Sequence, residues 1–346
     1  MRKTLAFLAA AAFLLTSCQK ELCYNHPHGF DNTHGKLKVS FLWDDVVNAS
    51  PTEMHLVAFS GGKNPVIYPL GGMSGGDVSL WGGNYWFVAY NSDTETVTTR
   101  GETFDEYEIC GIQRDLTKYV KGFEAHAKSF SYLGARSTKA DDSTYPDGTT
   151  FIWEPEQIWV STESDITVTP GSEQEVPMRM WNATYQYTFL IRNVENLNRV
   201  ATINASLSGL ASCYRPSEHC ARDYNASEIF SFTIVDETSI RGQLRVFGHS
   251  PEEEEGGQGT VTVPEEIPNT LTLYVTMDNG NRYGYQFDVT EDMANPTFST
   301  IDTQTGEIVI NIRIEDIPIP DQPSEPASGF DIGIDDFITE EWDIFP

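Results

Sequence analysis

Residues 271–289 read LTLYVTMDNGNRYGYQFDV, and this stretch decides the fold. Apolar side chains occupy every second position on both sides of the central DNGN sequence, at Leu271, Leu273 and Val275 before it and at Tyr283, Tyr285, Phe287 and Val289 after it. A period of two places these side chains on one face of a β-strand. Because Asn-Gly is a strong signal for a tight turn, the stretch predicts an antiparallel hairpin with one buried face.

The same period of two recurs in both halves of the chain. It is clearest at residues 185–191 and 308–314 in the second half, and the first half repeats the theme at residues 37–43, 54–59 and 84–90. Gly, Pro and Asn, which favour turns, separate these short segments. The pattern predicts an all-β protein of antiparallel β-sandwich domains. A chain of 346 residues is long enough for two domains with separate cores.

Small and polar residues at 137–150 indicate a long loop near the end of the first domain. We therefore predict an N-terminal sandwich domain at residues 36–160 and a C-terminal one at residues 161–320. Helical periodicity is scarce: residues 115–129 are the best candidate helix, and residues 291–294 could form a helical turn.

Residues 1–17 have the layout of a lipoprotein signal peptide. Two basic residues precede an apolar run that is about half of the roughly 20 residues needed to span a bilayer. The run ends in Leu15-Thr16-Ser17-Cys18, where an aliphatic residue lies three positions before the cysteine and a small residue directly before it. We predict that Cys18 carries the lipid and that residues 18–35 form a tether. The alternative is an ordinary secretory signal followed by a structural cysteine.

The residues after Cys18 and the net charge bear on location and partners. Gln19-Lys20-Glu21 lacks the aspartate that would favour retention in the inner membrane, so we expect a lipid-anchored protein of the outer membrane, at the cell surface. A net charge of −29 at pH 7 argues against nucleic acid and against docking on anionic lipid. Contact with the membrane is therefore expected through the lipid alone.

Four further cysteines could form disulfides in an exported protein: Cys23, Cys110, Cys213 and Cys220. Cys213 and Cys220 flank a six-residue loop. We favour a bridge that closes this loop, which leaves Cys23 and Cys110 as a second pair. Sequence does not determine the connectivity.

Two patterns resemble chemical sites. Gly72-Met73-Ser74-Gly75-Gly76 matches the G-x-S-x-G pattern of a nucleophile elbow, but a strand-like run follows it where that motif requires a helix. We interpret it as a glycine-rich hairpin loop and predict no enzymatic activity. Cys23, His26 and His28 could begin a metal site, but no fourth ligand lies nearby. We predict neither a metal nor a cofactor.

Trp81 and Trp153 lie beside loop residues and could stack on sugar rings. In β-sandwiches, tryptophans more often fill the core or cover its ends. A glycan ligand is therefore an alternative to a protein partner.

Residues 321–346 form a proline-hinged tail. Prolines before and within it prevent pairing as a central strand. Alternation then returns in GFDIGIDDF at residues 329–337. Its apolar positions are Phe330, Ile332, Ile334 and Phe337. This pattern predicts a strand that adds to a sheet edge, on its own domain or on a partner.

Several stretches resemble a known family. CQKELCYNHPHG at residues 18–29, followed by a strand ending in FLW at 41–43, resembles the start of a Bacteroidales family of lipoproteins of unknown function, and residues 329–337 resemble its ending. GNYWFVAYN at residues 83–91 is similar to a segment of fimbrillin and fimbrial-anchor proteins. Residues 185–196, followed by ASLSGL at 205–210, are similar to the opening of the anchor proteins' second domain.

The resemblance implies two transthyretin-like antiparallel β-sandwich domains in tandem. It also implies a cell-surface role as the anchor or an accessory part of a fimbria, with fimbrillin-like or other surface subunits as partners. Such fibres are thought to grow when a strand of one subunit completes a groove in the next. Cys18 would supply the lipid end and the tail the joining strand. The alternative function is a glycan-binding lipoprotein of a polysaccharide-uptake system.

Overall fold

The computed structural model describes residues 33–61, 64–114, 129–130, 150–249, 268–294, 298–301 and 308–319. Within these residues the chain is almost entirely β-structure, which confirms the predicted all-β sandwich fold. No helix in this part of the chain is long and apolar enough to cross a membrane. The predicted signal peptide, nearly all of the tether and the tail lie outside the described residues.

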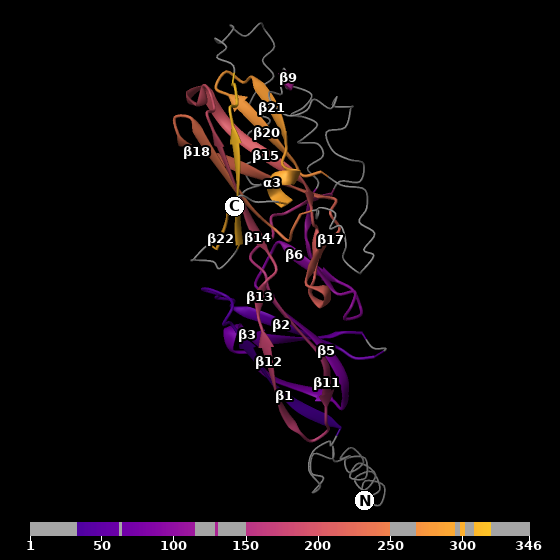
Figure 1. Cartoon of the computed structure of the whole chain (residues 1–346). Helices are drawn as coiled ribbons and strands as arrows, with labels where there is room; N and C mark the ends of the chain where they lie inside the picture. Colours follow the sequence, from indigo (N-terminus) through magenta and orange to yellow (C-terminus); the bar gives the residue numbers. More distant parts are fainter. Residues whose placement is uncertain are drawn as a thin grey trace, which may run out of the picture.

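The first sandwich packs a three-stranded sheet against a five-stranded sheet (Figure 1). The three-stranded sheet has the order β12 (Glu173–Arg179), β1 (His34–Leu42), β4 (Gly76–Trp81). The five-stranded sheet has the order β13 (Trp181–Asn182), β11 (Trp159–Val168), β5 (Gly83–Asn91), β2 (Glu53–Phe59), β3 (Val66–Gly71). β1 is parallel to β12 and antiparallel to β4.

The central strands β2 and β5 of the five-stranded sheet are buried on both faces. In β2, Met54, Leu56 and Ala58 pack inside the first sandwich. Val57 and Phe59 point the other way and pack in a second core. This two-sided burial explains why the sequence of β2 is a nearly continuous apolar run. A half-exposed strand would instead show strict alternation of apolar and polar residues.

A four-stranded linking sheet joins strands from the two halves of the chain. Its order is β17 (Cys220–Arg222), β16 (Cys213–Arg215), β7 (Glu108–Gly111), β6 (Val97–Arg100). Figure 1 shows β6 and β17 between the two sandwiches. The pairing of β7 with β16 therefore ties the first half of the chain to the second.

The second sandwich is formed by one long, folded sheet. Its order is β22 (Phe298–Ile301), β23 (Ile308–Glu315), β14 (Tyr185–Arg192), β19 (Ser239–Val246), β18 (Ala226–Asp236), β15 (Val200–Leu210), β20 (Thr270–Met277), β21 (Arg282–Asp288), β9 (Ser129–Phe130). β10 (Thr150–Ile152) pairs with β18 and with β8 (Gln113–Arg114). β18 serves both layers, because residues 226–231 pair with β15 and residues 232–236 pair with β19.

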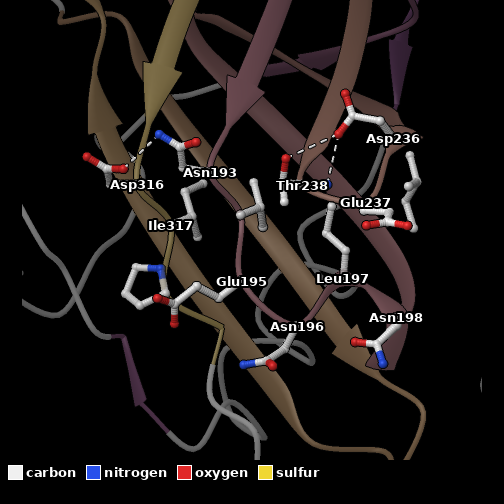
Figure 2. A pocket seen from close by; sticks show the side chains of 13 residues that line it. Asn193, Glu195, Asn196, Leu197, Asn198, Asp236, Glu237, Thr238, Asp316 and Ile317 are labelled. Carbon is white, nitrogen blue, oxygen red and sulfur yellow. Dashed lines mark hydrogen bonds between the residues drawn. The ribbon is translucent and has the colours of Figure 1, made fainter.

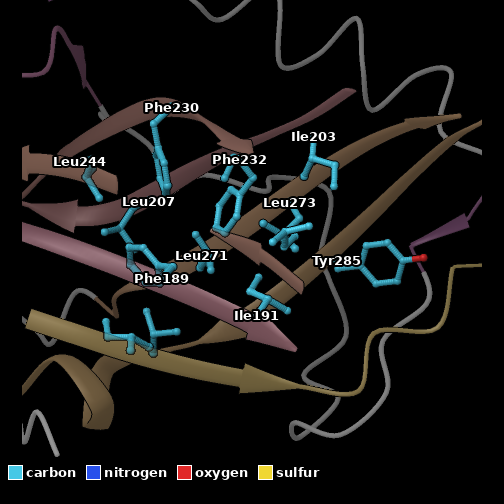
Figure 3. Packing of buried hydrophobic residues seen from close by; sticks show 14 of the residues in the cluster. Phe189, Ile191, Ile203, Leu207, Phe230, Phe232, Leu244, Leu271, Leu273 and Tyr285 are labelled. Atoms are coloured by element: carbon cyan, nitrogen blue, oxygen red, sulfur yellow. The ribbon is translucent and has the colours of Figure 1, made fainter. Parts of the chain in front are cut away.

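The fold of this sheet encloses the largest apolar cluster. Phe189 and Ile191 of β14 face Leu207 of β15 and Leu271 and Leu273 of β20, and all five are fully buried (Figure 3). Side chains at alternate positions of each strand supply this core. The predicted alternation in the second half is thereby confirmed.

The predicted hairpin and helical turn are present. The DNGN turn joins β20 to β21, and Gly280 has a φ of 78°, the left-handed region that favours glycine. The helical turn at residues 291–294 is α3 (Thr290–Ala294). The predicted helix at 115–129 lies outside the described residues, apart from Ser129, which begins β9.

Strand pairing does not follow the predicted boundary near residue 160. β11 and β12 pair with β5 and β1 of the first sandwich, although the prediction assigns residues 161–179 to the second domain. A polar loop marks where a strand ends but not which strand is its next partner. Between β5 and β11 in the sequence, β7 and β10 pair with β16 and β18 of the second half, and β11 then returns to β5. The chain then passes through β12 and β13 into β14, and the two sandwiches lie end to end (Figure 1).

Candidate functional site

Several predicted site residues lie outside the described part of the chain. They are Cys18, Cys23 and the tail residues Phe330, Ile332, Ile334 and Phe337. Lipid attachment and strand addition therefore stay predictions.

Trp81 is exposed, as the sequence predicted. It is the last residue of β4, with 56% of its surface accessible. Its indole lies against the His34 imidazole, with 4.1 Å between ring centroids and 41° between planes. The two residues are cross-strand partners where β1 begins. The pair forms an aromatic patch at the tether end of the first sandwich.

Trp153 is half-buried and already occupied on one face. The guanidinium carbon of Arg114 lies 3.4 Å from the ring centroid, a cation–π contact. Burial lowers the pKa of Arg114 below its usual range, yet an arginine stays charged. The covered face of Trp153 cannot also stack on a sugar. Because β10 beside it pairs with the second sandwich, Trp153 and Trp81 do not share one platform.

The cysteine pairing differs from the prediction. Cys110 of β7 is bonded to Cys213 of β16, so the favoured bridge between Cys213 and Cys220 is wrong. In the β16–β17 hairpin, Cys213 faces Arg222 and Cys220 faces Arg215, which places the two cysteines two positions out of register. Cys110 and Cys213 are direct partners in the β7–β16 pairing.

The observed bond also excludes the pairing of Cys23 with Cys110. Among the described cysteines, Cys220 has a free thiol, whose Sγ lies 3.7 Å from a carboxylate oxygen of Glu218. Burial raises the pKa of the Cys220 thiol above its ordinary value. A thiol that stays protonated is a poor nucleophile and a poor metal ligand.

A buried carboxylate accompanies the disulfide. Glu108 is 4% exposed and accepts hydrogen bonds from Arg100 Nε (2.7 Å) and Arg215 Nε (3.0 Å). Arg100 also pairs with Asp223. Glu108 and Cys110 alternate on β7 and so share a face. The Glu108 carboxylate and the two bonded sulfurs lie within 4.8 Å of one another, but sulfurs in a disulfide are not thiolate ligands.

The linking sheet covers a packed core. Val88 and Val160 of the five-stranded sheet contact a cluster that includes Ile109 of β7, Tyr214 of β16 and Phe247 after β19. The five-stranded sheet and the linking sheet therefore share a packed core, and the disulfide and the ion pairs of Glu108 connect β7 to neighbouring strands of the linking sheet. Sequence reasoning missed the Glu108 to Arg215 contact because 107 residues separate them. The only local signal was the alternation of Glu108 and Cys110.

Ser74 lies in a turn between sheets. It is the last residue of η1 (Gly72–Ser74), which joins β3 to β4. Those strands belong to different sheets, so the predicted hairpin loop is instead a crossover. Gly75 has a φ of 80°, and a Cβ there would lie 2.2 Å from the Val39 carbonyl oxygen. Gly75 of this motif thus has a packing reason.

Comparison with known proteins identifies relatives. The chain is 22% identical over 211 residues to Fim4B, a candidate fimbrium anchoring subunit of Bacteroides ovatus. The aligned region covers 60% of this chain and 54% of that protein. The chain thus spans about half the length of this curated relative. It also resembles the crystal structure of a candidate adhesin from Bacteroides ovatus, with a TM-score of 0.57 and 17% identity, over 84% of this chain and 94% of that one. At this identity the likeness establishes the fold alone.

A further likeness, to the fimbrial anchor protein Mfa2 of Porphyromonas gingivalis, has 14% identity over 81% of this chain and 90% of that one. Its TM-score is 0.42. A protein-family model described as a domain of unknown function, DUF5119, matches residues 17–231, more than half of the chain. The chain belongs to the DUF5119 family.

Proposed function

We propose that this protein is a non-enzymatic cell-surface lipoprotein of the fimbrial-anchor or accessory type. It acts by β-strand-mediated assembly with fimbrillin-like or other surface subunits. The observation that carries the proposal is the similarity to the candidate anchoring subunit Fim4B over 211 residues. The all-β fold shared with a candidate adhesin is compatible with it.

The geometry suits an anchor because it separates two ends. β1 begins at His34, so a lipid on Cys18 would hold the end of the first sandwich that lies away from the second. Residues 18–33 would span roughly 50 Å if fully extended. The second sandwich is then the part presented away from the membrane.

Lipid attachment is tested with radiolabelled palmitate in cells that express the wild type or Cys18→Ser. We expect only the wild type to be labelled and to fractionate with outer membranes. Cys23→Ser is the matched control and should keep both properties. Labelled Cys18→Ser protein would refute the anchor.

Assembly is tested by purifying the tagged lipoprotein from its own outer membranes and identifying co-purified proteins by mass spectrometry. We expect fimbrial subunits with the wild type and their loss when residues 324–346 are deleted. Unchanged recovery after the deletion would refute the role of the tail. Recovery of a porin-type transporter and glycosidases would instead favour glycan uptake.

Exposure of Trp81 supports the glycan-binding alternative. A sugar stacked on this indole should change its fluorescence. The test is a titration with oligosaccharides that compares the wild type with Trp81→Ala, and Trp153→Phe is the control. A fluorescence change that persists in Trp81→Ala would exclude this site.

A further inference from the structure

A groove lies at the end of the second sandwich that points away from the first. β14 and β23 run toward this end and β18 finishes there, as their pairing directions show. Three segments line it: the loop 193–198, the hairpin tip 236–238 and the segment 316–318, together with Ile234 (Figure 2). Its volume is about 1330 Å³. We name it the distal groove.

The walls of the distal groove are built by backbone hydrogen bonds. The N–H of Val194 donates to the Thr238 carbonyl (2.9 Å), and the N–H of Glu195 donates to the Ile317 carbonyl (3.0 Å). The loop is thus held between the hairpin tip and the segment after β23. A preformed groove binds with a smaller ordering cost than a loop that must close.

Apolar side chains form part of the lining of the groove. Leu197 and Ile317 are buried side chains on opposite sides of it (Figure 2). Ile234 also lines the groove, with 52% of its surface exposed. Covering an exposed aliphatic side chain in a concave site is favourable, because it removes apolar surface from water.

The rim of the groove is acidic. It carries the side chains of Glu195, Asp236, Glu237 and Asp316. None of the described residues that line it is a lysine or an arginine. Arg199, which follows the loop, is instead paired with Asp278 (2.8 Å). Within the described part of the chain, the rim carboxylates do not form a cluster tight enough to hold a metal ion.

Charge decides what can occupy such a groove. Residues 321–346 of the same chain contain eight Asp or Glu residues and no Lys or Arg, so an acidic rim repels them. A second copy of a chain with a net charge of −29 is disfavoured for the same reason. A basic partner is attracted.

We propose that the distal groove docks an extended segment of a partner protein in which an aliphatic side chain is flanked by lysine or arginine. The aliphatic side chain covers Ile234, and the flanking cations pair with Glu195 and Glu237. The proposal rests on the groove alone and does not depend on the fimbrial role or on strand addition by the tail.

The test is a fluorescence-polarisation titration of the full exported chain with two synthetic peptides, one alternating leucine with lysine and one alternating leucine with glutamate. We expect the lysine peptide to bind, with affinity that falls as salt is added, and the glutamate peptide not to bind. Ile234→Ser should weaken binding about tenfold. The double variant Glu195→Gln and Glu237→Gln should also weaken it and reduce the salt dependence.

Matched controls lie elsewhere on the surface. Val66→Ser on β3 removes an aliphatic side chain of similar exposure, 49%, and Glu102→Gln removes an exposed carboxylate. Both should leave the affinity unchanged. Equal loss in the controls, or equal binding of both peptides, would overturn the proposal. Tighter binding after deletion of residues 324–346 would also overturn it, because the groove would then belong to the chain's own tail.

Discussion

Glu228 is a carboxyl group buried in the second sandwich. It is 1% exposed, and neither carboxylate oxygen has a hydrogen-bond partner among the described residues. Burial, and then the nearby charge of Glu154, raises the pKa of Glu228 well above its ordinary value. The folded state therefore binds this proton more tightly than the unfolded state.

This shift has a defined effect on stability. Because the folded-state pKa is higher, the contribution of Glu228 is favourable at low pH and is lost as pH rises above the unfolded value of about 4.5. We expect Glu228→Gln to raise the melting temperature at pH 7 by about 2–4 °C, the shift that about 1 kcal/mol gives in a protein of this type. The measurement is thermal unfolding by circular dichroism between pH 4 and pH 8.

A control shows whether the change in melting temperature comes from the burial of the carboxyl group or from the loss of a negative charge alone. Glu102→Gln removes an exposed carboxylate and should change the melting temperature little at any pH. A Glu228→Gln variant that is equally or less stable than the wild type at pH 7 would show that Glu228 finds a partner.

Asn269 is a buried residue whose side-chain amide group donates to two backbone carbonyls. Its fully buried side-chain amide donates to the carbonyls of Ser208 (3.1 Å) and Gly209 (2.9 Å). Asn269→Ala leaves both carbonyls without this donor, so we expect a loss of about 1–3 kcal/mol in the free energy of unfolding. Urea denaturation measures the loss. The exposed Asn198 gives the control, because Asn198→Ala should cost less than about 0.5 kcal/mol.

At the scale of the elements, the disulfide closes a long loop. Cys110 and Cys213 are 103 residues apart, and for a loop of about that length the chain-entropy estimate is roughly 4–5 kcal/mol. We expect the double variant Cys110→Ser and Cys213→Ser to lose about 2–5 kcal/mol in urea denaturation. Cys220→Ser keeps the bond and should remain close to the wild type. Comparable loss in Cys220→Ser would contradict the observed pairing.

Alternation predicts strands well where one face is buried, as the hairpin of residues 271–289 shows. It predicts less about partners. β7 and β16 are short, and the sequence around Cys110 contains nothing that points to Cys213. The same limit applies to β11, whose return to β5 depends on packing against strands far away in the chain. Contacts of this kind are set by tertiary structure, which one sequence does not display.

At the scale of the whole molecule, the sequence predicts the fold class but not the contacts between segments that lie far apart in the chain. Composition, length and alternation gave two β-sandwiches, whereas the linking sheet and the distal groove form only when distant segments meet. The groove needs the loop after β14, the tip of β18 and the end of β23 together. None of these carries a recognisable motif on its own.

The parallel pairing of β1 with β12 determines how the molecule carries a pulling force. Seven residue pairs, from Lys36 with Glu173 to Leu42 with Arg179, join the two strands. A load between Cys18 and the second sandwich pulls β1 at its N-terminal end. It pulls β12 in the opposite direction at its C-terminal end, because β12 leads through β13 into β14. The inter-strand hydrogen bonds are then sheared together and do not open one at a time.

Single-molecule force spectroscopy can measure this arrangement. We expect a higher rupture force when the load is applied between residue 33 and the second sandwich than when it is applied between residue 48 and the second sandwich. Residue 48 lies beyond the other end of β1, so a load applied there would peel the strand away. Equal forces would contradict the shear geometry. If Cys18 carries the proposed lipid, this pairing would resist extraction of the protein when the second sandwich is pulled away from the membrane.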